Sequence, residues 1–144
     1  MKYIKKYNES QNTLIHDDLK EFCQEGLIAL IDEGFHVMLK KPHNKTGFIV
    51  KLFKYGGDRK LGFTWNEIED YYIPFLHRLS NLYSIETVIT IELVYINGNG
   101  TTSNAGREHI KIDELEDYSK EYEVITKDAP IKIGNVLVAV EGKL

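Results

Sequence analysis

Residues 85–96, IETVITIELVYI, limit the fold more than any other stretch of the sequence. Apolar and polar side chains alternate through this run, which is the pattern of a strand that buries one face. The apolar side comprises Ile85, Ile89, Ile91, Leu93 and Tyr95, and the polar side comprises Glu86, Thr90 and Glu92. A strand with one solvated face belongs to an antiparallel or mixed sheet. We therefore expect helices on only one side of the sheet.

The first of two predicted helices spans about residues 16–33. Apolar residues recur there at the three- and four-residue spacing of a helix, and Gly34 is expected to end it. Gly26 lies on the apolar stripe. This indicates either that another element approaches closely or that the helix is weakened by about 1 kcal/mol relative to alanine.

The second predicted helix begins at Thr64 and runs to about residue 82. Thr64 and Glu67 have the spacing of a capping box. The inward stripe is formed by Ile68, Tyr72, Phe75, Leu76 and Leu79. Pro74 removes one backbone hydrogen bond, so we expect it to kink the helix or to divide it in two.

The remaining segments are read mainly as strands. The predicted strands are residues 35–41, 48–55, 109–112, 122–126 and 131–140, with a short helix at 113–118 begun by a capping box of Asp113 and Glu116, and a turn or bulge at Gly134 and Asn135. We expect an α+β fold: a two-layer sandwich with two helices packed on one face of a mainly antiparallel sheet of four to six strands. Residues 1–144 are expected to form one domain, with a flexible N-terminal lead at 1–12.

The composition suits a soluble globular protein. The chain has 144 residues, of which 42% are hydrophobic and 28% are charged. No apolar run approaches the roughly 18 residues that span a bilayer, and residues 1–12 lack the apolar core of a signal peptide. With one cysteine, no internal disulfide is possible. These features predict an intracellular protein, or one exposed only inside a larger assembly, that does not enter a membrane.

The net charge of −4 includes a basic segment at residues 36–63 beside an acidic one at 64–123. Aromatic Phe53 and Tyr55 lie between the cations of the basic hairpin, a pattern that can hold single-stranded nucleic acid. The candidate contacts with an anion or nucleic acid are Lys40, Lys41, Lys51, Lys54, Arg59, Lys60 and Arg107. The alternative is that these charges only solvate exposed positions. Since Lys51 and Phe53 share one face of an interior strand, part of the set is expected to be covered.

A Gly- and Asn-rich stretch, YINGNGTTSNAGREH, occupies residues 95–109. It fails the P-loop spacing and the dinucleotide-binding fingerprint. Its Asn-Gly pairs are typical of turns, so we expect a mobile connection between strands over 97–107. The alternative is a ligand loop, in which the anion would be held by Thr101, Thr102, Ser103 and Arg107.

No catalytic residue, metal site or cofactor is predicted. The five histidines show no metal-binding spacing, and Cys23 is expected to be a buried thiol, because it lies on the apolar stripe of the first helix. The acidic segment lacks the calcium-loop pattern. It is expected to form a solvated patch that contacts a partner protein, made of Asp113, Glu114, Glu116 and Asp117.

The start MKYIKKYNES, followed by DDLKEFCQEGLIALIDEGFHVML, resembles a pattern in small uncharacterised proteins of tailed bacteriophages with low-GC genomes. The stretch FTWNEIEDYYIPFL resembles another part of the same group, so the resemblance covers roughly residues 1–95. The resemblance implies a phage origin and a location in the host cytoplasm or the virion. It implies nothing about an activity, because the group has no established one. Some phages cleave virion proteins after a glutamate near the N-terminus, which makes the bond between Glu9 and Ser10 a possible site. Two positions before the glutamate, such sites usually have an aliphatic residue, and this chain has Tyr7.

Three functions are therefore expected in order. The first is a non-enzymatic phage protein that binds another phage or host protein, as an accessory virion component or a host-interaction factor. The second is a binding module for nucleic acid or a phosphorylated small molecule, which would use the basic hairpin and the 97–107 loop. The third is a small metal- or phosphate-dependent enzyme.

Overall fold

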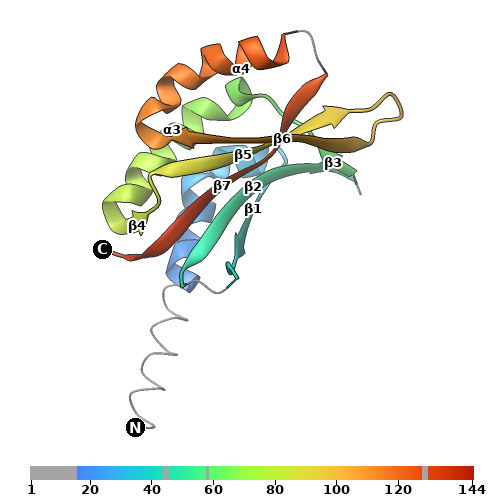
Figure 1. The fold of residues 1–144 in the computed structure, drawn as a ribbon. Helices are drawn as coiled ribbons and strands as arrows, with labels where there is room; N and C mark the ends of the chain where they lie inside the picture. Colours follow the sequence, from blue (N-terminus) through green and yellow to red (C-terminus); the bar gives the residue numbers. More distant parts are fainter. Residues whose placement is uncertain (1–15, 44–45, 58, 128–129) are drawn as a thin grey trace.

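The computed structural model describes residues 16–43, 46–57, 59–127 and 130–144. The expected flexible lead at 1–12 and the expected cleavage site after Glu9 lie outside these ranges. The described elements pack around one hydrophobic core as a sheet with helices against it (Figure 1). The α+β class expected from the sequence is thereby confirmed.

In the described part of the chain, the sheet has seven strands, all paired antiparallel. Five lie side by side in the order β1-β2-β7-β5-β6. The total of seven exceeds the four to six strands that were expected. Their bounds are Phe35–Lys40 for β1, Phe48–Gly56 for β2, Ile131–Lys143 for β7, Val88–Ile96 for β5 and Thr102–Lys111 for β6. Two three-residue strands complete the sheet: β3 (Arg59–Leu61) pairs with β2, and β4 (Tyr83–Ile85) pairs with β7. Therefore β7 is central, and β1 and β6 form the edges.

The helical layer lies on one side of the sheet, as expected (Figure 1). It consists of residues 16–26, α2 (Ile28–Asp32), α3 (Trp65–Leu82), the 3₁₀ helix η1 (Ile112–Asp117) and α4 (Tyr118–Thr126). The first two come from the single helix predicted at 16–33, which a turn at Leu27 interrupts. Gly34 follows with φ of +99°, the left-handed conformation in which glycine ends a helix.

Gly26 marks a close approach between helices, which resolves the two alternatives left by the sequence. A Cβ atom at this position would lie 2.8 Å from Cδ1 of Phe75 on α3. The absence of a side chain at Gly26 therefore gives room for the Phe75 ring, which is fully buried.

The helix α3 begins at the predicted capping box. The backbone N–H of Thr64 donates to Oε2 of Glu67 over 2.6 Å, and the Thr64 hydroxyl donates to the same oxygen over 3.2 Å. All five residues of the predicted inward stripe are buried. Pro74 lies inside one continuous helix, so of the two expected outcomes, a kink or a division, the division into two helices is excluded.

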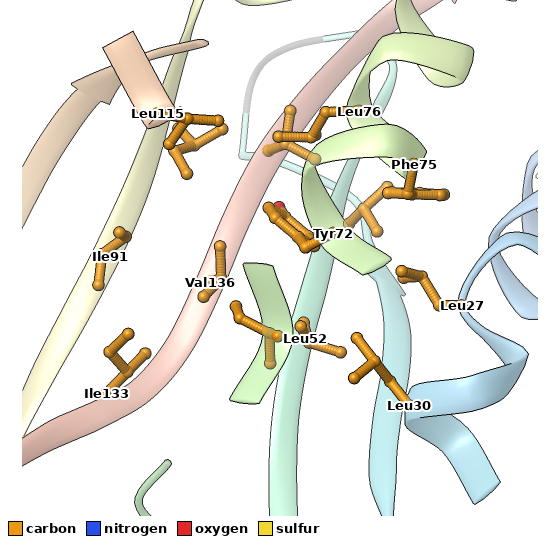
Figure 2. Close-up of a cluster of buried hydrophobic side chains, with 14 of the residues drawn as sticks. Leu27, Leu30, Leu52, Tyr72, Phe75, Leu76, Ile91, Leu115, Ile133 and Val136 are labelled. Atoms are coloured by element: carbon orange, nitrogen blue, oxygen red, sulfur yellow. The ribbon is translucent and has the colours of Figure 1, made fainter. Parts of the chain in front are cut away.

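The core lies between the helical layer and the middle of the sheet (Figure 2). Side chains in register build its sheet side: Leu52 on β2 lies opposite Val136 on β7, which lies opposite Ile91 on β5. The helical side includes Leu27, Leu30, Tyr72, Phe75 and Leu76, which Figure 2 shows gathered between the helices and the sheet. Cys23 is also fully buried, and burial raises the pKa of its thiol to about 12.

The long strand predicted at 85–96 is divided. The strand β4 ends at Ile85 and β5 begins at Val88. Tyr95, which was expected on the buried side, is 42% exposed, and Val94 is buried instead. The register with both neighbouring strands shifts beside Leu93, and a β-bulge increases the local twist and ends a simple alternation.

One predicted strand is a helix. Residues 122–126 belong to α4, because Tyr118 and Tyr122 are four residues apart and both point into the core. The short helix expected at 113–118 is the 3₁₀ helix η1, but its expected capping box is wrong, since its N-cap is Lys111 and no side chain caps it. The bulge expected near Gly134 is confirmed: Glu92 pairs with Asn135 and Leu93 with Ile133, which leaves Gly134 as the extra residue.

Candidate functional site

The part of the chain that the structure describes places no helix on the second side of the sheet, which we call the uncovered face (Figure 1). One row of side chains crosses this face through five strands. In register, the row comprises His36 on β1, Phe53 on β2, Asn135 on β7, Glu92 on β5 and Arg107 on β6. Since neighbouring residues of a strand point to opposite sides, this row identifies the other residues that face away from the core.

Apolar side chains form a strip beside that row, on the three middle strands. Ile49 on β2 lies opposite Ala139 on β7, and Leu137 and Val88 are close by on β7 and β5. These four residues, the apolar strip, are half-buried and line one concavity of about 790 Å³. A half-buried apolar surface on a sheet is a surface that a further layer would normally cover.

Charged side chains surround the strip. Lys40 lies opposite Ile49 on the β1 side, and Lys51 lies opposite Leu137. Arg107 lines the concavity from the β6 side, while Glu86 and Glu141 line it at one end. The strip is therefore flanked by cations along both sides of the sheet and by carboxylates at one end.

An aromatic cluster occupies the β1–β2 end of the row. The rings of His36 and Phe53 stack with centroids 5.5 Å apart and planes 14° apart, and Tyr55 meets Phe53 edge-on at 5.1 Å. Lys51 places its Nζ 5.3 Å from the Phe53 centroid. As a result, Phe53 is only 6% exposed, while His36 and Tyr55 remain exposed.

Asn135 is the buried polar residue at the centre of the row. Its Nδ2 donates to Oε1 of Glu92 over 3.3 Å, and Oε2 of Glu92 lies 3.4 Å from Nη2 of Arg107. Its Oδ1 is buried without a hydrogen-bond partner among the described residues. This acceptor can be satisfied only by a donor that enters from the uncovered face or by a local rearrangement.

Lys60 lies close to the same centre. A Cβ atom built on Gly134, next to Asn135, would lie 3.5 Å from Cε of Lys60. Burial lowers the pKa of Lys60, and repulsion from Lys51 lowers it further, whereas attraction to Glu92 raises it. These three charged groups therefore interact, although they come from three different strands.

The cations predicted to bind an anion do not form one surface. Lys40, Lys51, Lys60 and Arg107 belong to the uncovered face. Lys54 lies on the opposite side, where its Nζ is 4.9 Å from the Phe35 centroid and 3.7 Å from Oε1 of Glu67. The reason is the alternation of β2, because residues 51 and 54 are an odd number of positions apart.

The other two predicted cations lie apart from this group. Lys41 is over the ring of Phe48, which packs against the core. Arg59 donates from Nη1 to the backbone oxygen of Asn99 over 3.3 Å. The β2–β3 hairpin and the Gly- and Asn-rich turn therefore do contact each other, but away from the concavity.

The connection predicted at 97–107 is mostly strand, since β6 begins at Thr102. Side chains shape the short turn that remains: the N–H and hydroxyl of Thr101 donate to Oδ1 of Asn99, and the Ser103 hydroxyl donates to Oδ1 of Asn97. These donors are occupied within the turn, and Arg107 is beside Glu92. The arrangement does not favour an anion-binding loop.

The acidic patch expected from the sequence is exposed. All four members lie on the solvent side of η1: Asp113, Glu114, Glu116 and Asp117. Across the described ranges, no group of acidic, histidine or cysteine side chains is placed to hold a metal ion. Nor does any helix in those ranges combine the length and apolar character needed to cross a bilayer.

Comparison with known protein families, with curated proteins and with solved structures finds no match to this chain. The sequence did not single out Asn135, His36 or Glu92 as one constellation. The signal that was present is an asparagine inside the apolar run IKIGNVLVAV. Its meaning depends on pairing with β5 and β2, which are distant in the chain.

Proposed function

We propose that this is a non-enzymatic protein that binds another protein through the uncovered face of its sheet, and that the bound element is an amphipathic helix with acidic flanks. The apolar strip in its concavity carries this proposal. A helix laid on the strip would form a second helical layer, as in three-layer α/β arrangements. An amphipathic helix in an apolar groove is a common form of protein recognition.

The charges around the strip support an acidic partner. Lys40 and Lys51 lie on one side of it and Arg107 lies on the other, so carboxylates on the two flanks of a bound helix would meet cations. Cross-interface charge complementarity raises the association rate and fixes the orientation. Glu86 and Glu141 close one end of the concavity and would favour the positively charged N-terminus of the partner helix.

The setting that we propose follows from the resemblance to phage proteins. The protein would act in the host cytoplasm or in the virion, either as a host-interaction factor or as an accessory virion component. In each case its action is to hold one phage or host protein.

A designed peptide tests the proposed binding. The probe is an amphipathic helix of about 18 residues, with leucine on one face and glutamate on both flanks. We expect Leu137→Glu to weaken its binding by about tenfold or more. Leu82→Glu is the matched control, since Leu82 is 51% exposed at the end of α3, in the helical layer. Fluorescence anisotropy would measure both affinities.

Two outcomes would count against the proposal. One is an equal loss of binding in the Leu137 and Leu82 variants. The other is stronger binding of the same peptide when lysine replaces glutamate on its flanks.

A second candidate function is binding of nucleic acid or a phosphorylated small molecule. Lys51 lies over the ring of Phe53, and Lys60 lies opposite Tyr55 on the uncovered face. Cations among aromatic rings can hold single-stranded nucleic acid, which favours this candidate. It predicts that a labelled single-stranded oligonucleotide binds at low salt and that Lys51→Gln with Lys60→Gln abolishes this binding. Binding of the oligonucleotide with no binding of the acidic helix would select this candidate.

A further inference from the structure

The edge strand β6 has one free side. It pairs with β5 and with no other strand among the described residues. Along such an edge, every second residue presents its backbone N–H and C=O away from the sheet. These groups can pair with another extended chain.

The two halves of β6 differ in how well they can accept a strand. A bulge lies in the first half, where Leu93 pairs with Gly106 and Val94 with Asn104, so that Ala105 is the extra residue. Bulges disturb an edge and reduce its capacity to pair. From Arg107 to Lys111 the register is continuous. The accessible part of the edge is therefore this second half.

A hollow lies between this half of β6 and α4. Its volume is about 460 Å³, and its lining residues are Glu108, Lys120, Glu121, Val124 and Ile125. Val124 is 77% exposed, which leaves an apolar side chain of α4 facing the hollow without a cover. Figure 1 shows α4, in orange, on the β6 side of the sheet.

Two carboxyl groups line this hollow, one on each wall, and Lys120 is the one cation among its lining residues. Burial raises the pKa of Glu108, and repulsion from Glu121 raises it further. A positively charged side chain bound between Glu108 and Glu121 would therefore relieve their repulsion.

We propose that the groove between β6 and α4 binds an extended segment of a partner protein, which adds a strand to β6 and places a lysine or arginine side chain between Glu108 and Glu121. The aliphatic stem of that side chain would cover Val124, and its charge would reach the two carboxylates. Side chains of the added strand alternate between the two faces. Only every second residue of the partner segment can therefore face the two carboxylates. This inference does not depend on the proposed use of the uncovered face.

A random peptide library tests this inference. Peptides of about twelve residues are selected on the immobilised full-length protein, and the enriched sequences are then measured by fluorescence anisotropy. We expect enriched peptides to carry at least one lysine or arginine, and any further basic residue on the same face of the strand to be two positions away. We also expect their amides and those of residues 107–111 to be protected from hydrogen exchange in the complex.

Matched variants on α4 locate the site. Glu121→Lys reverses a charge in the hollow, while Glu123→Lys makes the same change on an exposed residue of the same helix outside it. We expect the first to weaken binding by about tenfold or more and the second by less than about threefold. Val124→Ser, at a position that is 77% exposed, is expected to weaken binding by about threefold or more.

The inference would be overturned by any of three results. The first is that no peptide is enriched. The second is that Glu121→Lys and Glu123→Lys weaken binding equally, which would indicate a general charge effect. The third is that residues 107–111 gain no protection when a peptide binds.

Discussion

Asn135 donates a side-chain N–H to Glu92 across the β7–β5 pair, with 3.3 Å between Nδ2 and Oε1, while its Oδ1 is buried without a partner among the described residues. This amide lies in the middle of the uncovered face, in the row that runs from His36 to Arg107. A buried polar atom without a hydrogen bond costs about 1–3 kcal/mol. A hydrogen-bond donor that reached Oδ1 from a bound partner would remove this cost.

Asn135→Asp is expected to destabilise the protein by about 2 kcal/mol or more at about pH 7. The new carboxylate would be buried beside Glu92, so its pKa in the folded protein would be raised. The loss of stability would therefore be complete above the pKa of the new aspartate in the folded protein. It would disappear as the pH falls below the pKa of this aspartate in the unfolded chain. Urea unfolding at about pH 7 and about pH 4 would measure the difference.

Asn104→Asp is the control for this substitution. Asn104 is exposed, and its Oδ1 accepts the N–H of Gly106 over 2.8 Å, a role that a carboxylate oxygen can also take. Little change is expected. If both variants lost the same stability, burial of Asn135 would not be the cause.

Gly26→Ala is expected to lower the thermal midpoint. The added Cβ would meet Phe75 at 2.8 Å, and overpacking costs about 1–3 kcal/mol, which outweighs the gain in helix propensity of about 1 kcal/mol. In a Phe75→Leu background the same change should cost less, because the ring is absent. Gly142→Ala is the control, since nothing lies within 4 Å of its added Cβ. A stabilising effect of Gly26→Ala would contradict the close approach.

Glu108→Gln is expected to stabilise the protein at neutral pH. Burial and then Glu121 raise the pKa of Glu108, so ionisation is less favourable in the folded protein than in the unfolded one. Below the pKa of Glu108 in the unfolded chain, the carboxyl is protonated in both states and does not change the free energy of unfolding. As the pH rises through the pKa in the folded protein, ionisation of Glu108 lowers the free energy of unfolding. Thermal midpoints at about pH 7 and about pH 4 should show a gain that shrinks at the lower pH. A gain of equal size at both values would exclude this cause.

Tyr72→Phe is expected to be neutral or to stabilise the protein by up to about 1 kcal/mol. The Tyr72 hydroxyl is buried in the core without a hydrogen-bond partner among the described residues, and burial raises the pKa of its phenol above the usual range. Removal of an unsatisfied hydroxyl removes its desolvation cost. Guanidinium unfolding would measure the change, and a loss above about 1 kcal/mol would show that the hydroxyl has a partner in solution.

Local patterns were sufficient for much of the fold. The capping box of Thr64 and Glu67, the ending of the first helix at Gly34 and the bulge at Gly134 depend on residues close together in the sequence, and each was predicted. The interior position of β2 followed from apolar residues on both its faces. The polar residues on one face of β5 indicated that helices cover only one side of the sheet.

Contacts between distant segments decided the rest. Strand alternation implied that Lys51 and Lys54 lie on opposite faces of β2. It did not indicate which of these two faces the helices cover. The helical state of residues 122–126 depends on Tyr118 and Tyr122 meeting the core. The Asn135–Glu92 contact depends on the pairing of β7 with β5, which no local pattern specifies.

The central claim is that the uncovered face binds an amphipathic helix, and a backbone NMR titration with the acidic helical peptide tests it most directly. We expect the largest shift changes at Ile49, Val88, Leu137 and Ala139, together with a change in the side-chain amide signals of Asn135. Changes confined to the helical layer or to the turn at residues 97–101, with these five residues unaffected at saturation, would contradict the claim.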